Sequence, residues 1–154
     1  MIRTRMGRTT LCAVAVALAT SAATAAAAGF TGATVPRQND TVNSNRVTKV
    51  KVSCPSTASG SCVGKLTLKS SNKVHGHILT LGASNFTIAA GQTQPVKVKV
   101  SKTTANMVKH GKIKSNAIAS SHDGSGGSNV ANKTKITLKK ASGNTQGAPQ
   151  GSLY

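Results

Sequence analysis

Apolar and polar residues alternate with a period of two along most of the chain between residues 46 and 140. Because successive side chains of a strand point to opposite faces, this alternation predicts half-buried β-strands. About seven short strands are expected, separated by turn residues such as Asp123-Gly124. The predicted inward-facing positions are Thr48, Val50, Val52, Cys54, Cys62, Gly64, Leu66, Leu68, Leu79, Leu81, Phe86, Ile88, Val96, Val98, Val100, Ile113, Ser115, Ala117, Ala119, Thr134, Ile136 and Leu138.

One segment departs from this alternation. Ser101 or Thr103 is suited to cap a helix, and Met107 and Val108 are placed to pack against a sheet. Residues 101–109 are therefore predicted to form one or two helical turns. Many short strands with turn signals between them favour an antiparallel β-sandwich. The predicted fold is all-β, with about seven strands and one short helical turn.

Residues 1–28 have the layout of a secretory signal peptide. Basic residues precede an apolar stretch that starts at Leu11 and continues in small residues to Ala28, where Ala-x-Ala sites predict cleavage. A transmembrane anchor is disfavoured, because the stretch is rich in Ala, Thr and Ser and its core is shorter than the ~20 strongly apolar residues of a span. We expect a mature chain without a membrane span, secreted and extracellular or associated with the cell wall.

The rest of the chain divides by composition. Residues 29–45 are small and polar, and we expect a flexible lead with room for a short edge strand at 31–35. Residues 46–140 carry the strand pattern and form the predicted domain. Residues 141–154 are Gly, Ser, Gln and Pro without periodicity, which predicts a disordered tail.

Cleavage at this place would remove Cys12 and leave a pair, Cys54 and Cys62. An even pair in an exported chain favours a disulfide, and the turn-forming residues between them allow the chain to reverse. The alternative is a redox or metal pair, but the spacing is not Cys-x-x-Cys and no His is nearby. We predict a structural disulfide that staples a hairpin and stabilises the fold by about 2–3 kcal/mol.

Several segments resemble the immunoglobulin-like β-sandwich module of exported and cell-surface actinobacterial proteins. They are Val-Lys-Val-Ser-Cys-Pro at 50–55, Cys-Val-Gly-Lys-Leu-Thr-Leu at 62–68, Leu-Gly at 81–82, Phe-Thr-Ile-Ala-Ala-Gly at 86–91, Val-Lys-Val-Lys-Val-Ser at 96–101 and Asp123-Gly124. The resemblance covers residues 46–140. It implies a spacer or adhesive role and no catalytic residues.

Charge is the most unusual property of the sequence. The chain has 20 Lys and Arg against 2 acidic residues, a formal net charge of +18. Loss of the three Arg in residues 1–28 would leave 17 basic residues and a net charge of +15. Lysines fall on the outward positions of the predicted strands: Lys49, Lys51, Lys65, Lys69, Lys97, Lys99, Lys112, Lys114, Lys133, Lys135 and Lys139.

Two interpretations of these lysines stand side by side. They could bind anionic cell-wall or extracellular polymers, DNA or an anionic membrane surface. They could instead serve solubility and block edge-to-edge pairing of strands. Sequence-specific reading of nucleic acid is not expected, because the chain has no Trp, one Tyr, two Phe and few Arg.

No catalytic site or cofactor is expected. The only acids are Asp40, in the predicted lead, and Asp123, in a glycine-rich loop, so paired-carboxylate chemistry would need two distant segments to meet. No Gly-x-Ser-x-Gly motif is present, and the side chains of adjacent His122 and Asp123 point apart.

The alternative function is extracellular copper or zinc binding. His75 and His77 could offer two imidazoles to one ion, with His110 or His122 as further ligands. No acid or cysteine lies near enough in the sequence to act as a local third ligand. The preferred hypothesis is therefore a secreted cationic structural or binding module, with no metal.

Overall fold

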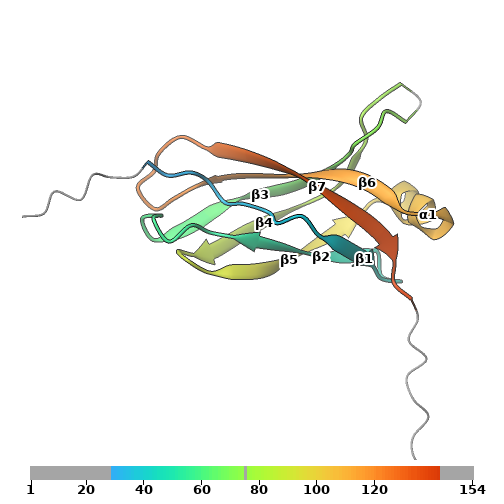
Figure 1. The fold of residues 1–154 in the computed structure, drawn as a ribbon, viewed down its shortest axis with the longest axis horizontal. Coiled ribbons are helices and arrows are strands. Elements are labelled where there is room, and N and C mark those ends of the chain that lie inside the picture. The colour runs from blue at the N-terminus through green and yellow to red at the C-terminus, as the bar shows by residue number, and fades with distance from the viewer. Residues whose placement is uncertain (1–28, 75, 143–154) are drawn as a thin grey trace, which may run out of the picture.

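The computed structural model describes residues 29–74 and 76–142, which form a mostly β structure with one helix (Figure 1). The elements in chain order are β1 (Asn39–Val42), β2 (Val47–Ser53), β3 (Ser61–Ser70), β4 (Thr80–Ala89), β5 (Thr93–Val100), α1 (Lys102–His110), β6 (Ile113–His122) and β7 (Val130–Lys140). The all-β class predicted from the alternation is confirmed.

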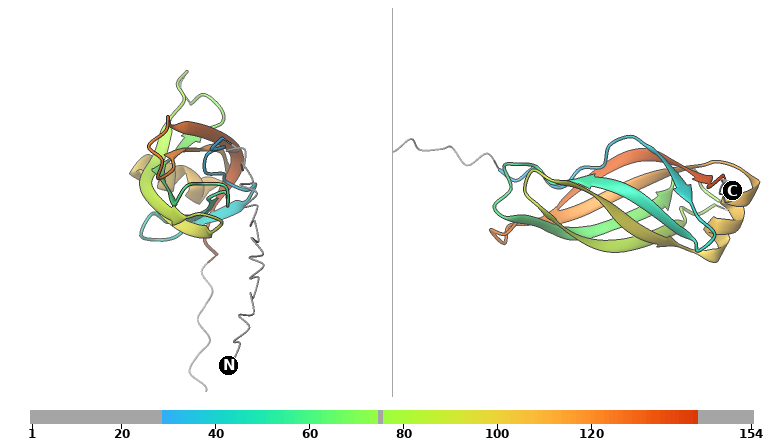
Figure 2. Two further views of the ribbon diagram at one scale, coloured as in Figure 1. Left: turned by 90° about the vertical axis from the view of Figure 1, so that its left-hand side faces the viewer. Right: turned by 90° about the horizontal axis from the view of Figure 1, so that it is seen from below.

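The seven strands form a single sheet in the order β1-β7-β6-β3-β4-β5-β2. Neighbouring strands are antiparallel except β1 and β7, which run parallel, so the predicted purely antiparallel arrangement is wrong at this pair. Seen end on, the sheet curls into a ring in which β1 and β2 approach each other (Figure 2). The layers expected of a sandwich are thus joined into one nearly closed sheet.

The seam between β1 and β2 is closed by only a few bonds. Thr34 bridges Ser53 through two backbone hydrogen bonds of 2.9 and 2.8 Å. The side-chain amide of Gln38 both donates to and accepts from the backbone of Lys51, at 3.4 Å each. The Asn43 side chain accepts from the backbone N–H of Val47 at 2.8 Å. Side chains therefore replace part of a regular ladder here.

The core lies inside the curled sheet and is built mostly from the inward positions that the alternation predicts. Aliphatic side chains dominate it, with Phe86 as its one fully packed aromatic. Additional contributions come from Ala33, Val35 and Val42, which the sequence did not mark as core. Burial of this apolar surface is the main favourable contribution to the stability of the fold.

The predicted helical segment is confirmed as α1, which covers one end of the curled sheet (Figure 1). The Ser101 hydroxyl accepts a hydrogen bond from the backbone N–H of Thr104 at 3.1 Å, the capping role expected of it. Thr104 is buried and its hydroxyl donates to the carbonyl of Leu81 at 3.3 Å. Val108 is buried as expected, whereas Met107 is only half-buried.

The predicted hairpin between the two cysteine-bearing strands is wrong. β2 pairs with β5, while β3 pairs with β4 and β6. The disulfide between Cys54 and Cys62 therefore joins the end of β2 to the start of β3 across the interior, with a Cα–Cα distance of 5.7 Å. Alternation fixes the face of a strand but carries no information about its partner.

Residues 29–45 are part of the domain and not a flexible lead. Val35 and Val42 are buried in the core, and β1 pairs along its whole length with the last strand. The segment also contributes the Thr34 bridge at the seam. Its apolar residues are few and separated by polar ones, and each is covered by strands far away in the sequence.

Two predictions lie outside the described residues. They are the signal peptide at 1–28, with Cys12, and the tail from residue 143 onward. Within residues 29–74 and 76–142, no helix has the length and apolarity needed to cross a membrane.

Candidate functional site

The charged side chains of the domain are segregated by sign. Asp40 and Asp123 are the only acidic residues in the chain, and they are 7% and 5% exposed. The described residues also include 15 Lys and 2 Arg. The surface of the described domain therefore presents positive side chains without exposed carboxylates between them.

The Asp123 carboxylate accepts hydrogen bonds within its own loop and from a neighbouring loop. It accepts from the backbone N–H groups of Ser59 and Ser125, at 3.1 Å each, and from the Ser125 hydroxyl. The Ser125 hydroxyl bond, followed by the Ser59 amide, holds the pKa of Asp123 below its ordinary value of 3.8. This network ties the β6–β7 loop to the disulfide loop. Asp123 therefore acts as a structural anchor between these two loops.

Asp40 is buried at the seam between β1 and β2. Burial raises its pKa from 3.8 to about 6, and the Lys51 ammonium opposes that shift. Its Oδ2 atom has no hydrogen-bond partner, and neither has the hydroxyl of buried Thr48 on β2. Asp40 thus lies at the β1–β2 seam and Asp123 at the β6–β7 loop, in different parts of the domain.

The lysines predicted to face outward do so. Ten of the eleven are exposed and Lys69 is half-buried. Strand pairing gathers most of them into two groups and leaves Lys65, Lys112 and Lys139 apart from both. The β2–β5 lysine cluster consists of Lys49, Lys51, Lys97 and Lys99.

Like charges meet directly in the β2–β5 lysine cluster. Lys49 is the register partner of Lys97, and Lys51 and Lys99 occupy the next outward positions on the same face. Opposed residues in an antiparallel pair have Cβ atoms about 4.5–5.5 Å apart, a distance at which like charges destabilise the pair. The fold therefore tolerates electrostatic repulsion at this place.

The second group centres on Asn116 of β6. Lys69 of β3 and Lys135 of β7 are its register partners on either side, so the three side chains form a row across the outer surface. We call the surrounding surface the β3–β6–β7 basic face. Its cations are Arg37, Lys69, Lys114, Lys133 and Lys135.

This basic face is hollowed. One depression of about 560 Å³ is lined by Lys114, Lys133 and Lys135, together with Ser71 and Asn116. The Ser71 hydroxyl and the Asn116 Oδ1 are shielded from solvent and lack hydrogen-bond partners. An anionic ligand oxygen entering the depression would therefore meet three ammonium groups.

A neighbouring depression of about 320 Å³ extends the basic face. It is lined by Arg37, Lys133 and Lys135. Arg37 was not among the expected site residues, because it lies in the segment predicted to be a flexible lead. Asn116 was not among them either, although its outward position near Lys114 in a predicted strand was a usable signal.

The histidines do not assemble into a metal centre within the described residues. His77 is exposed at the end of a tight turn in which Val74 and His77 exchange backbone hydrogen bonds of 2.8 and 3.1 Å. His75 lies outside the described residues. The His122 ring contacts the carbonyl of Asp123 at 3.0 Å and not its carboxylate. No group of three His, Cys, Asp or Glu side chains comes together in residues 29–74 and 76–142.

The disulfide predicted from the cysteine count is confirmed as Cys54–Cys62. Both cysteines are buried, so neither sulfur is offered to a solvent thiol or a metal. No family model, curated protein or solved structure matches this chain.

Proposed function

We propose that the protein is a secreted, cationic structural or binding module at the cell surface that associates electrostatically with anionic wall polymers. The observation that carries this proposal is the segregation of charge, with seventeen cations in the described domain and both acids buried. A surface of one sign attracts and concentrates polyanions. The buried disulfide suits an oxidising, extracellular setting.

Solubility and edge protection explain the lysine placement less well. Edge protection concerns strands with unpaired backbone groups, which here are β1 and β2. Lys65, Lys69 and Lys114 lie on central strands, paired on both sides. Solubility is also served by mixed charges, which would avoid the opposed Lys49 and Lys97. Binding of a polyanion would account both for the lysines on central strands and for the opposed Lys49 and Lys97.

The strand pairing supports the proposal that this is an immunoglobulin-like sandwich. Such domains pair strands B, E and D in one sheet and C, F and G in the other. Here β2, β5 and β4 lie side by side in the order of B, E and D. β6 lies between β3 and β7, as F lies between C and G. The added β3–β4 pairing joins the two sheets. The disulfide differs from the inter-sheet B–F bridge of antibody domains, because it links consecutive strands.

Binding would proceed through the β3–β6–β7 basic face and the β2–β5 lysine cluster. Each lysine that contacts a phosphate or carboxylate releases a condensed counterion, so affinity falls steeply as salt rises. Ammonium groups act as point charges and do not read base edges as the guanidinium fork does. We therefore expect broad selection among polyanions and none among nucleotide sequences.

The test measures binding of the secreted, oxidised protein to purified cell wall, to double-stranded DNA and to neutral dextran across a salt series. We expect binding to the first two, weakening with salt, and none to dextran. A triple variant, K114A/K133A/K135A, should lose more affinity than K65A/K112A/K139A, which removes equal charge away from the hollowed face. Absence of binding to both polyanions at physiological salt would overturn the proposal.

A further inference from the structure

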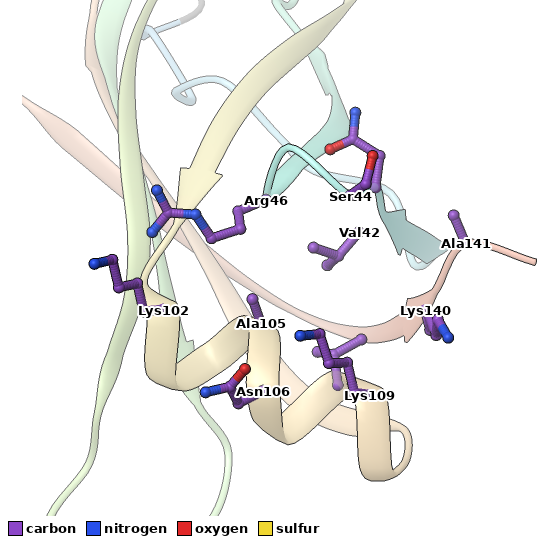
Figure 3. A pocket seen from close by; sticks show the side chains of 11 residues that line it. Val42, Ser44, Arg46, Lys102, Ala105, Asn106, Lys109, Lys140 and Ala141 are labelled. Atoms are coloured by element: carbon purple, nitrogen blue, oxygen red, sulfur yellow. The ribbon is translucent and has the colours of Figure 1, made fainter. Parts of the chain in front are cut away.

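A third concavity, lined by no lysine of either group, lies at the end of the sheet covered by α1 (Figure 3). Its volume is about 600 Å³, within the range of small-molecule sites. Three segments that are distant in the sequence build it: the turn between β1 and β2, the helix α1, and the end of β7 at Lys140 and Ala141.

The base of this cavity is apolar. Val42 and Val108 line it and are only 5% and 3% exposed, so they belong to the hydrophobic core. Ala105 is half-buried and packs against that core. Because alanine is small, the helix leaves an opening above the core at this point. An apolar group placed there would be shielded from water on several sides.

The rim of the cavity is cationic. Arg46, Lys102, Lys109 and Lys140 line it, and no acidic residue does. Figure 3 shows Arg46 and Lys102 on one side of the opening and Lys109 and Lys140 toward the other, with Val42 between them. The site thus combines an apolar base with charges of one sign around its opening.

The walls are fixed in place. Arg46 has φ of 61°, which makes it the one non-glycine residue with positive φ in the described chain. Its N–H donates to the carbonyl of Asn43 at 3.0 Å and its carbonyl accepts from Val100 at 2.8 Å. A left-handed backbone costs a non-glycine residue free energy and is kept where the surroundings require it. The Ser101 cap and the Thr104–Leu81 bond hold α1 on the opposite side.

We infer that this cavity binds a small amphiphilic anion, in which a phosphate or carboxylate head is attached to a short aliphatic body. The body would lie over Val42, Ala105 and Val108, and the head would meet the cations of the rim. A hydrated polymer gains nothing from the apolar base, so this ligand class differs from that proposed for the lysine faces. The inference does not depend on polyanion binding.

Hexyl phosphate is the probe for this site, titrated into the secreted, oxidised protein and followed by amide chemical shifts. Inorganic phosphate tests the head alone, 1-hexanol tests the body alone, and hexyltrimethylammonium carries the opposite charge. We expect hexyl phosphate to bind at least tenfold more tightly than inorganic phosphate, with shifts concentrated in α1 and the β1–β2 turn. Hexyltrimethylammonium should not bind.

Two variants address the rim and the base separately. K102A/K109A should weaken hexyl phosphate binding at least tenfold, whereas K49A/K97A, which removes two charges from the β2–β5 lysine cluster, should change it less than twofold. A105L fills the opening with a residue of high helix propensity and should block the aliphatic body while leaving binding of inorganic phosphate unchanged.

Two results would overturn the inference. The first is equal affinity for hexyl phosphate and inorganic phosphate. The second is an equal loss in K102A/K109A and K49A/K97A, which would mean that only net charge matters. Salt-dependent binding to cell wall is measured separately. The proposal for the lysine faces and the inference for this cavity can therefore each be contradicted without the other.

Discussion

Lys49 on β2 and Lys97 on β5 lie directly opposite each other in an antiparallel pair, with no acid among their register partners. The K49E variant would replace this repulsion with an attraction. We expect K49E to raise the free energy of unfolding by about 0.5–1 kcal/mol at low salt. Urea denaturation at low and high salt measures the effect, which should shrink as salt screens the pair.

K65E is the matched control for this prediction. It makes the same charge change, but Lys65 has Asn85 and Ser120 as register partners and faces no cation. Its effect should be smaller than that of K49E by about 0.5 kcal/mol. Equal effects would show that relief of net charge, and not the opposed pair, determines the result.

The buried carboxyl of Asp40 predicts an unusual dependence of stability on pH. The folded protein holds the Asp40 proton up to about pH 6, whereas the unfolded chain releases it near 3.8. Unfolding is therefore favoured as pH rises through this window, and stability should fall by about 2–3 kcal/mol between pH 4 and pH 7. Denaturant unfolding at intervals of half a pH unit measures this.

The D40N variant isolates that contribution. It removes the titrating group and keeps the side-chain shape, so its stability should vary less between pH 4 and pH 6 than that of the native protein. Asp123, with its lowered pKa, acts in the opposite sense and only as pH falls below about 4. Parallel pH curves for D40N and the native protein would contradict the assignment to Asp40.

Loss of the Cys54–Cys62 bond should weaken the fold. The bond closes a loop between residues 8 apart and joins β2 to β3, which share no ladder. We expect the C54A/C62A variant to lose about 2–3 kcal/mol of unfolding free energy. Heating in the presence of a reductant, which reaches the buried bond as the chain unfolds, should lower the thermal midpoint of the native protein and leave that of the variant unchanged.

Gly64 is required by close backbone approach. A Cβ at this position would collide with the carbonyl oxygen of Ser120 and lie 2.8 Å from the Cα of Ser121, both on β6. G64A should therefore cost at least about 2 kcal/mol, measured by thermal unfolding. G111A is the control, since Gly111 has open space and extended backbone, and it should be nearly neutral. Similar losses in both variants would contradict this account.

The sequence predicted the inward faces of the strands, the helix and the disulfide, because each depends on local pattern. Alternation placed Val50 and Leu66 inside, the Ser101 hydroxyl marked the helix start, and the cysteine count indicated the bond. These signals involve neighbouring positions and need no knowledge of which strands meet.

Strand partners could not be predicted in this way. The apolar runs around Leu81 and Ile88 were expected as separate strands, but both belong to β4, since Ser84 and Asn85 continue the strand between them. β1 has four residues and pairs with β7, about a hundred positions away. So short an edge strand is specified by the surface that it covers and not by its own periodicity.

The candidate surfaces were partly predictable. The outward lysines were correctly placed, but their grouping follows from register, which sets Lys49 against Lys97 and puts Asn116 between Lys69 and Lys135. The cavity beside α1 had no sequence signal, because its walls come from three segments that meet only in the folded chain.

The parallel pairing of β1 with β7 has a mechanical consequence. The described chain enters at one end of the domain and leaves at the other, and β1 and β7 run side by side in the same direction (Figure 1). Tension between the two ends pulls these strands past each other, at right angles to their hydrogen bonds. The bonds from Asn39 to Val42 are then loaded in shear and share the force, whereas an unzipping geometry would break them one by one. A pull along the length of the domain is therefore resisted by several hydrogen bonds at once.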